Sequence, residues 1–371
     1  MLTRRELAKR FSLVAAGIAF GGEAAYSQRR KLKGRDLSNV VLLNGNENPD
    51  GPPPESIEAM SHVLTRCGRY HDDDMDHLAD AIVKSEGIET DQLLIGSGSS
   101  EILHAAVAAY ASPKVPLITG SPSYELPVDM STAYGFPVIK IALTPGDYAA
   151  DVRKMVAAAE KARGGLIYVV NPNNPTSSIT KKADIDWLVN NLPPNTMALI
   201  DEAYIHFSTD PNLVSAMPYV RQKNNVIVCK TFSKIYGMAG LRAGYGCANK
   251  DVIAKLAVFR NNTIAVPAMA AARVALGLPN MVPERQQKFA KIRTDICQWL
   301  DAKGYKFIPP HGNFMMIEVH RESSLVASDM LDRGVAVGRP FPPYDTLLRV
   351  TIGSETDMAK FKEVFQQVVK V

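Results

Sequence analysis

A lysine near the end of an apolar run is the residue of this sequence best suited to covalent chemistry. Lys234 closes the segment Lys-Thr-Phe-Ser-Lys, which begins at Lys230 directly after the apolar run 226–229. A lysine leaving a buried strand loses solvation, so the pKa of its amine falls and Schiff-base formation is favoured. Lys230 is the competing candidate, and a solvated surface lysine is the plain alternative for either residue. Alone this signal is unspecific, so Lys234 is a candidate amine that has to be considered together with the groups below.

An aspartate follows another apolar run in the same way. Asp201 comes directly after residues 197–200, and Tyr204 follows it closely. A carboxylate at the end of a buried strand can pair with a protonated ring nitrogen of a cofactor, while a tyrosine hydroxyl donates to an oxygen nearby. The alternative is that Asp201 caps the N-terminus of a helix.

Two loops and an arginine supply further binding groups. The loop at 171–176 contains two prolines and three asparagines, so it is rigid and carries directed hydrogen-bonding groups. The segment Gly-Ser-Gly-Ser-Ser at 96–100 precedes a predicted helix, so backbone N–H groups and hydroxyls can converge on a phosphate. Arg242 adds a cation. Plain turns are the alternative for both loops, but all these groups together are what pyridoxal phosphate requires.

The elements that must position these groups alternate along the chain. Short apolar runs bounded by turn residues occur at 91–95, 115–119, 166–170, 197–200 and 226–229, with helical patterns between them. Near-continuous apolar strands separated by helices predict an α/β fold, with a mostly parallel sheet covered by helices on both faces. Such a sheet binds ligands at the carboxyl ends of its strands, where the candidate groups fall.

The pattern changes after residue 265, where we predict a smaller α+β domain. A long helical stretch at 268–300 is followed by strand-like segments at 305–308, 313–319 and 347–352 and by a final helix at 357–369. Residues 38–60, which are rich in Asn and Pro, are expected to form an irregular arm.

Composition and charge exclude several classes of protein. Of the 371 residues 46% are hydrophobic, which excludes a disordered chain, and no stretch has the roughly 20 apolar residues of a membrane-spanning helix. The four cysteines are too scattered for a disulfide framework or a zinc cluster. The net charge of +4 comes from residues 1–35, with nine basic and two acidic residues. The remainder therefore offers no nucleic-acid-binding surface.

The N-terminus has the order of an export signal. Arg4 and Arg5 precede an apolar run at 11–22, and small residues interrupted by Tyr26 follow at 24–27. This order is typical of twin-arginine signals and predicts a periplasmic protein. A basic amphipathic helix in a cytoplasmic protein is the alternative. The predicted organisation is an export signal at 1–30, an arm at 31–60, a large cofactor-binding domain at 61–265 and a small domain at 266–371.

In their order these motifs resemble those of the fold-type-I pyridoxal-phosphate aminotransferases of class I and II, and among them the histidinol-phosphate aminotransferases. The resemblance runs from about Leu43 to the C-terminus. Each motif alone is unspecific, but the ordered set is highly specific. It comprises residues 43–49, 69–70, 96–101, 122–124, 171–176, 201–204, 233–234, 241–244 and 348–353.

The resemblance implies a role for each matching residue. Lys234 would carry pyridoxal phosphate as a Schiff base, and Asp201 would hold the pyridine nitrogen. The other cofactor contacts would be Tyr204 and Asn174 at the ring hydroxyl oxygen, Tyr124 on the ring face, and Ser99, Ser100, Ser233 and Arg242 at the phosphate. Tyr70 would reach the phosphate of the neighbouring subunit, which implies a homodimer with shared active sites.

The resemblance also implies three substrate-binding residues. Arg349 would bind the substrate carboxylate through a bidentate pair, with Asn48 nearby. Histidinol-phosphate aminotransferases carry a second arginine in the region of Arg339, where it meets the substrate phosphate. Because Gly338 and Pro340 flank Arg339, its side chain can point into the site or out. An inward side chain predicts a donor with a distal anion, and an outward one predicts a neutral or aromatic donor.

The sequence departs from the family pattern at two places. Ser177 stands where the family usually has glycine after the threonine of the asparagine loop. His71 and the acidic run after it replace the usual proline-containing stretch. The run could suggest a metal site, but no separate ligand motif supports one. We therefore expect no metal and interpret the run as the acidic start of a helix before Leu78.

The expected reaction is transamination between a small amino donor and a 2-oxo acid such as 2-oxoglutarate. Histidinol phosphate and aromatic amino acids are the favoured donors. One alternative is a pyridoxal-phosphate-dependent decarboxylase or lyase acting on a phosphorylated amino acid. The other is a non-catalytic binding protein that retains the fold. The presence of Lys234, Asp201, Tyr204 and Arg242 argues against a decayed site.

Overall fold

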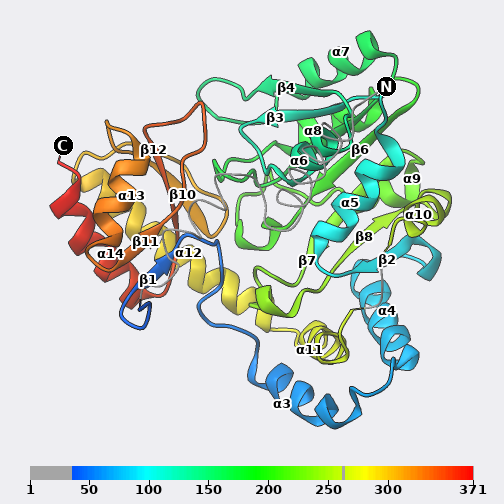
Figure 1. The fold of residues 1–371 in the computed structure, drawn as a ribbon, viewed down its shortest axis with the longest axis horizontal. Helices are drawn as coiled ribbons and strands as arrows, with labels where there is room; N and C mark the ends of the chain where they lie inside the picture. The colour runs from blue at the N-terminus through cyan, green and yellow to red at the C-terminus, as the bar shows by residue number, and fades with distance from the viewer. Residues whose placement is uncertain (1–35, 261–263, 371) are drawn as a thin grey trace, which may run out of the picture.

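The computed structural model describes residues 36–260 and 264–370, and its centre is a seven-stranded sheet (Figure 1). The strand order is β2-β8-β7-β6-β5-β3-β4. Neighbours from β4 to β7 run parallel, whereas β8 is antiparallel to both β2 and β7. The predicted mostly parallel sheet is therefore confirmed. Its strands are β2 (Leu93–Gly96), β3 (Leu117–Ser121), β4 (Val138–Ala142), β5 (Gly165–Val170), β6 (Thr196–Asp201), β7 (Val226–Thr231) and β8 (Gly244–Ala248).

Both faces of the sheet are buried at its central strands β5 and β6, which explains why these two strands are nearly continuously apolar, whereas the edge strand β4 is partly exposed. In β5, Leu166, Tyr168 and Val170 join one hydrophobic cluster, while Ile167 and Val169 join the other. Successive side chains of a strand point to opposite faces, so each face receives alternate residues.

Helices cover each face of the large sheet. The cluster on one face includes α5 (Ser99–Tyr110), α6 (Leu126–Ala133) and α10 (Lys250–Ala257). The cluster on the other includes α4 (Asp72–Glu86), α7 (Val152–Ala162), α8 (Lys182–Asn190) and α9 (Met217–Gln222). The helix α4 begins with three aspartates, as expected, and these favour the positive end of the helix dipole.

The smaller domain contains two small sheets packed with helices. An antiparallel sheet has the order β12-β10-β9, and β1 pairs with β11 in parallel. Figure 1 shows this domain at one end of the molecule, with α12 running from it towards the large sheet. Its elements are β9 (Phe307–Ile308), β10 (Phe314–Glu318), α13 (Ser323–Leu331), β11 (Val335–Val337), β12 (Leu347–Thr351) and α14 (Glu355–Val368).

Two segments differ from the sequence-based expectations. The helical stretch at 268–300 is two helices, α11 (Val266–Leu276) and α12 (Met281–Ala302). Gly277 and Pro279 lie at the break, and both residue types interrupt helices. The arm is not wholly irregular, because it contains β1 (Val41–Leu43) and most of α3 (Pro54–Val63). Since β1 pairs with β11, the arm also adds a strand to the small domain.

Within the described ranges, none of the helices combines the length and the apolar character needed to cross a membrane. The predicted export signal at residues 1–30 lies outside the described residues.

Candidate active site

Lys234 lies just beyond β7, and its amine has backbone carbonyls as hydrogen-bond partners. The Nζ atom donates to the Asn46 carbonyl oxygen at 3.0 Å and to that of Gly45 at 3.3 Å. It also stands 5.5 Å from the ring centroid of Tyr204. Burial, helped by the positive charge of Arg349, lowers the pKa of Lys234 to about 8. The amine is therefore close to deprotonation near neutral pH, as a nucleophile or base requires.

Lys230, the competing lysine, has a different environment. Its Nζ lies 2.8 Å from Glu86 Oε2 and 3.8 Å from Glu202 Oε2, and all three side chains are largely buried. Burial acts to lower the pKa of Lys230, but the charges of Glu202 and Glu86 outweigh burial and raise it. Lys230 is a charged member of a buried ion network, so the structure favours Lys234 as the reactive amine.

Asp201 ends β6 and is almost fully buried. Its Oδ2 accepts a hydrogen bond from the Tyr168 hydroxyl at 3.1 Å, and its Oδ1 accepts one from the Ala203 N–H at 3.1 Å. Burial raises the pKa of Asp201 to about 6. The bond from Ala203 is a local turn, so Asp201 does not cap an α-helix. A buried carboxylate of this kind is stabilised by a cationic partner such as a protonated ring nitrogen.

The Tyr204 hydroxyl lies among amide groups. Asn46 Nδ2 donates to this hydroxyl at 3.3 Å, and Asn174 also hydrogen-bonds to it. Burial raises the pKa of Tyr204 to about 12, so the hydroxyl keeps its proton and remains a donor. The predicted pair of Tyr204 and Asn174 is thus brought together beside Lys234.

The predicted phosphate-binding residues come together at the start of α5. Arg242 Nη2 donates to Ser100 Oγ at 3.2 Å, and Arg242 Nη1 lies 3.4 Å from Ser233 Oγ. A Cβ atom at Gly98 would lie 2.4 Å from Arg242 Nη2, and one at Gly244 would lie 2.3 Å from the Ser99 nitrogen. The two glycines therefore let a guanidinium, hydroxyls and a helix N-terminus share one small space. This cradle fits the phosphate of the expected cofactor.

Three other predicted residues have distinct positions. Tyr124 is 38% exposed, but burial of its hydroxyl raises its pKa to about 12, and the charges of Asp201 and Arg242 also act on that hydroxyl, which therefore lies near this site. Asn48 Nδ2 donates to the Ile235 carbonyl at 3.0 Å, so this amide holds the loop after Lys234. Tyr70 is 84% exposed, so it contacts little of its own chain within the described residues.

Two arginines of the small domain flank one aromatic ring. Arg349, on β12, donates to Asn174 Oδ1 at 2.8 Å and to the Asn44 carbonyl at 2.7 Å. Its Cζ lies 4.7 Å from the Phe341 ring centroid, and that of Arg339 lies 4.1 Å away. Arg339 also forms an ion pair with Glu125. Its side chain thus faces Arg349 and the large domain.

Arg349 also carries an unused donor. Its Nε is buried and has no hydrogen-bond partner in the part of the chain that the structure describes. An unpaired buried donor is unfavourable unless a ligand completes it. The hydrogen bonds of this guanidinium are therefore incomplete within the described residues.

Several residues of the site were not predicted from the sequence. Tyr168 and Asn46 contact Asp201 and Tyr204, respectively. Arg285 of α12 donates to the Ile235 carbonyl at 2.8 Å and to that of Gly51 at 2.8 Å, so it holds the lysine loop. Tyr168 lies on β5, the strand that leads directly into the asparagine loop, and this position in the sequence could have indicated that it belongs to the site. No local pattern pointed to Glu125, Phe341 or Arg285.

The serine that departs from the family pattern joins the two domains. Ser177 has a φ of 60° and its Oγ accepts hydrogen bonds from the N–H groups of Gly312 at 2.8 Å and His311 at 3.2 Å. A left-handed backbone is unfavourable for a serine. The bonds to the 311–312 turn offset that strain and tie the asparagine loop to the small domain.

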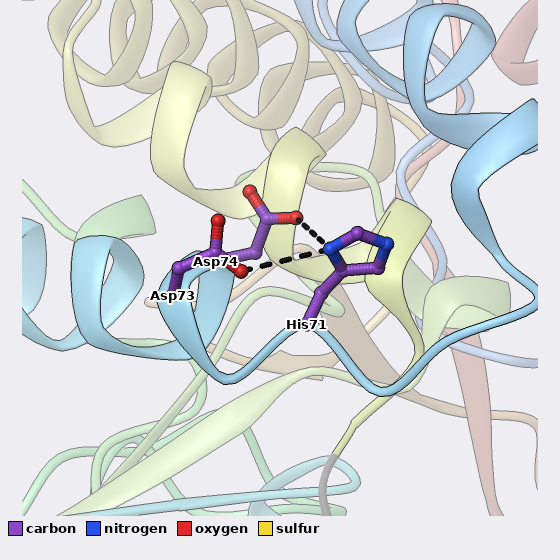
Figure 2. A group of neighbouring side chains, drawn as sticks. All are labelled: His71, Asp73 and Asp74. Atoms are coloured by element: carbon purple, nitrogen blue, oxygen red, sulfur yellow. Dashed lines mark ion pairs between the residues drawn. The ribbon is translucent and has the colours of Figure 1, made fainter.

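The acidic run after Tyr70 is paired with an arginine that precedes it in the sequence. Figure 2 shows His71 Nδ1 facing Asp73 and Asp74, at 3.6 Å and 3.9 Å. Ligand atoms of these three residues lie within 4.8 Å of one another. Arg66 Nη2, however, lies 2.9 Å from His71 Nδ1 and 3.1 Å from Asp74 Oδ2. This guanidinium supplies the positive charge that the carboxylates need, and its contacts hold the turn at Tyr70 against the start of α4.

The raised pKa of Asp201 predicts a pH-dependent stability of the cofactor-free protein. Because the folded-state pKa is about 6, the folded protein holds this proton more tightly than the unfolded chain. The stabilisation is therefore full below about pH 4 and is lost as the pH rises through 6. Relative to wild type, Asp201→Asn should gain about 2–3 kcal/mol in unfolding free energy between pH 4 and pH 7.

Urea unfolding across this pH range measures the difference. The exposed Asp80→Asn variant in α4 is the matched control and should show no such gain. A free-energy difference for Asp201→Asn that does not vary with pH would contradict the prediction.

The comparisons with known proteins agree with this geometry. A family model described as aminotransferase class I and II matches residues 38–368. The histidinol-phosphate aminotransferase of Moorella thermoacetica is 32% identical over 337 residues, covering 90% of this chain and 86% of that protein. That of Akkermansia muciniphila is 31% identical over 342 residues, covering 91% and 92%.

A solved structure shares the fold. The histidinol-phosphate aminotransferase of Sinorhizobium meliloti, in complex with pyridoxal 5'-phosphate, superposes with a TM-score of 0.85. It is 23% identical, and the match covers 96% of each chain.

Proposed function

Because this chain belongs to the class I and II aminotransferases, and is a pyridoxal-phosphate-dependent transaminase, we propose that its donor carries a phosphate that two guanidinium groups bind. Histidinol phosphate is the leading candidate, with 2-oxoglutarate as the acceptor. The observation that carries the proposal is the pair of guanidinium groups, Arg339 and Arg349, on the ring of Phe341. Two adjacent guanidiniums suit a phosphate dianion.

The residues of the site fit the cofactor at each of its groups. Ser99, Ser100, Ser233 and Arg242 would bind the phosphate. Asp201 would pair with the ring nitrogen, Tyr124 would lie on the ring face, and Tyr204 and Asn174 would hold the ring hydroxyl oxygen. When bound, pyridoxal phosphate supplies an aldehyde for amine exchange and a ring that withdraws electrons from the donor's α-carbon.

The chain's own residues would move the protons. Lys234 Nζ would take the proton from the donor's α-carbon, because its pKa of about 8 leaves a useful fraction of neutral amine near neutral pH. The Asp201 carboxylate would keep the ring nitrogen protonated. Tyr168, which donates to Asp201 Oδ2 at 3.1 Å, would orient that carboxylate. Arg285 and Asn48 would hold the lysine loop through the Ile235 carbonyl.

Arg349 would fix the donor's anion. Asn174 and the Asn44 carbonyl hold its two terminal nitrogens, which sets the orientation of the guanidinium before the donor arrives. A donor oxygen at the unpaired Nε would complete its hydrogen bonds. Arg339 would add a second charge-assisted contact when the donor carries a phosphate.

A panel of donors tests the proposed function, with 2-oxoglutarate as acceptor. We expect transfer from histidinol phosphate, and Arg339→Gln should lower kcat/KM for this donor by roughly tenfold or more. The value for phenylalanine, which has no distal anion, should change much less. An equal, small change for both donors would remove the phosphate-binding role of Arg339. Failure of the wild type to use histidinol phosphate would contradict the proposed donor.

We further propose a homodimer in which Tyr70 serves the partner's site. Tyr70 is 84% exposed, and Leu64 and Ile57, which precede it in the sequence, are 60% and 52% exposed. Large apolar side chains exposed in one segment of the chain favour a protein–protein contact there. Mixing inactive Lys234→Ala subunits with inactive Tyr70→Ala subunits should restore part of the activity, because one site of each heterodimer is intact. Verified heterodimers without activity would contradict shared sites.

We also propose export by the twin-arginine route, which rests on the pattern of Arg4, Arg5 and the apolar run at 11–22. Fractionation of cells that express the full chain is the test. A protein found wholly in the cytoplasm with residues 1–27 intact would refute it.

A further inference from the structure

The ion pair between Arg339 and Glu125 bears on which donors the site accepts. We propose that Glu125 determines specificity by letting one pocket take two classes of donor. Its carboxylate pairs with Arg339 when the donor has no distal anion. When the donor carries a phosphate, the carboxylate moves away and the phosphate pairs with Arg339 instead. This inference rests on the proposed transaminase function.

The position of Arg339 does not depend on Glu125. Arg339 Nη1 donates to the Pro340 carbonyl at 3.0 Å, and its Cζ lies 4.1 Å from the ring centroid of Phe341. The side chain of Arg339 is 12% exposed, whereas that of Glu125 is 37% exposed. The guanidinium therefore stays in place if the ion pair opens, and the carboxylate is the partner that moves into water.

Glu125 stands where a donor would meet it. It follows Tyr124, whose hydroxyl senses the charges of Asp201 and Arg242 within the site, and it precedes α6 in the large domain. Arg339 comes from the small domain. Burial lowers the pKa of Arg349, and the charges of Arg339 and Glu125 also act on it, in opposite directions. The three groups thus form one charged cluster, at which the donor's anion would bind.

The charge of the donor decides which arrangement is stable. A phenylalanine donor offers its carboxylate to Arg349 and nothing to Arg339. Without Glu125, the Arg339 charge would then be largely buried and unpaired, which is unfavourable. A phosphate brings two negative charges and can replace the Glu125 carboxylate, which regains its hydration outside. Glu125 therefore weakens phosphate binding somewhat and supports the neutral donor.

Titration of the cofactor-loaded enzyme with inorganic phosphate tests this exchange. With the cofactor bound, its phosphate cradle is filled, so the donor pocket is the site under test. Calorimetry should show phosphate binding roughly fivefold more tightly to Glu125→Gln than to wild type, the factor expected for a partly exposed ion pair. The matched control is Glu363→Gln, which removes a surface carboxylate paired with Lys360 and should bind phosphate as wild type does.

The double variant Glu125→Gln/Arg339→Gln distinguishes two explanations of tighter phosphate binding. One is that Glu125 competes with phosphate for Arg339, and the other is that removal of any nearby negative charge favours an anion. If Glu125 competes for Arg339, this variant binds phosphate as weakly as Arg339→Gln alone. Equal phosphate affinity in wild type and Glu125→Gln would overturn the proposal. The proposal would also be overturned if adding Glu125→Gln to the Arg339→Gln variant raised the phosphate affinity as much as it does in the wild type.

Kinetics supply an independent measurement. In Glu125→Gln the ratio of kcat/KM for histidinol phosphate to that for phenylalanine should rise by about fivefold or more. An unchanged ratio would overturn the specificity role. If wild type does not use histidinol phosphate, the proposed donor fails, whereas the phosphate titration still decides the role of Glu125.

Discussion

The Lys234→Ala variant is expected to lose about 10⁴-fold in kcat while it keeps a wild-type thermal stability. Lys234 Nζ donates only to the carbonyls of Asn46 and Gly45 in the described part of the chain. Its removal therefore leaves no buried carboxylate without a partner. The loss falls on catalysis because no other amine stands ready to exchange with the donor or move its proton.

Borohydride reduction of the cofactor-loaded enzyme supplies the direct measurement. The reduced cofactor should be found on the peptide that contains Lys234, and the Lys234→Ala variant should give no such adduct. A label on Lys230 would overturn the assignment, and wild-type enzyme without any adduct would contradict the catalytic role of the lysine.

Replacement of Lys230, four residues earlier, is expected to have the opposite profile. We expect Lys230→Met to lower the unfolding free energy by about 3–5 kcal/mol, because a buried ion pair that loses one partner leaves an uncompensated charge. Glu86 and Glu202 both lie within 3.8 Å of the Lys230 amine. Glu86 also accepts a bond from the Tyr245 hydroxyl at 2.6 Å, so it cannot turn away without further loss.

Urea unfolding of the cofactor-free protein measures this loss. Lys182→Met is the matched control, because Lys182 is 54% exposed and pairs with Asp186 on the surface. That variant should lose no more than about 1 kcal/mol. A similarly small loss for Lys230→Met would show that the buried network does not stabilise the fold. Adding Glu86→Gln and Glu202→Gln should recover part of the stability.

The two lysines illustrate where sequence reasoning reaches its limit. Lys230 lies within β7 and Lys234 just beyond it, and both come soon after the apolar residues 226–229. The difference between their environments comes from Glu86, which is distant in sequence and meets Lys230 at 2.8 Å. Local pattern carries no information about such a partner, so only the folded chain explains why the pKa of Lys230 is raised while that of Lys234 is lowered.

The arm and the long helical stretch show a second limit. The break between α11 and α12 could have been predicted from Gly277 and Pro279, since both residue types interrupt helices. The strand β1 could not have been predicted, because Val41–Leu43 is short and its partner Val335–Val337 lies near the other end of the chain. A three-residue strand has no periodicity of its own and exists through that pairing.

The sequence by itself determined the α/β fold, the family, the cofactor and the set of reactive groups. Strands buried on both faces are continuously apolar, and the carboxyl ends of parallel strands meet at one edge, so local pattern is sufficient there. Only the tertiary structure decided the direction of Arg339, its pairing with Glu125 and its position beside Arg349 on Phe341. The physical reason is that charge and hydrogen bonding act through space, between residues that no sequence window contains together.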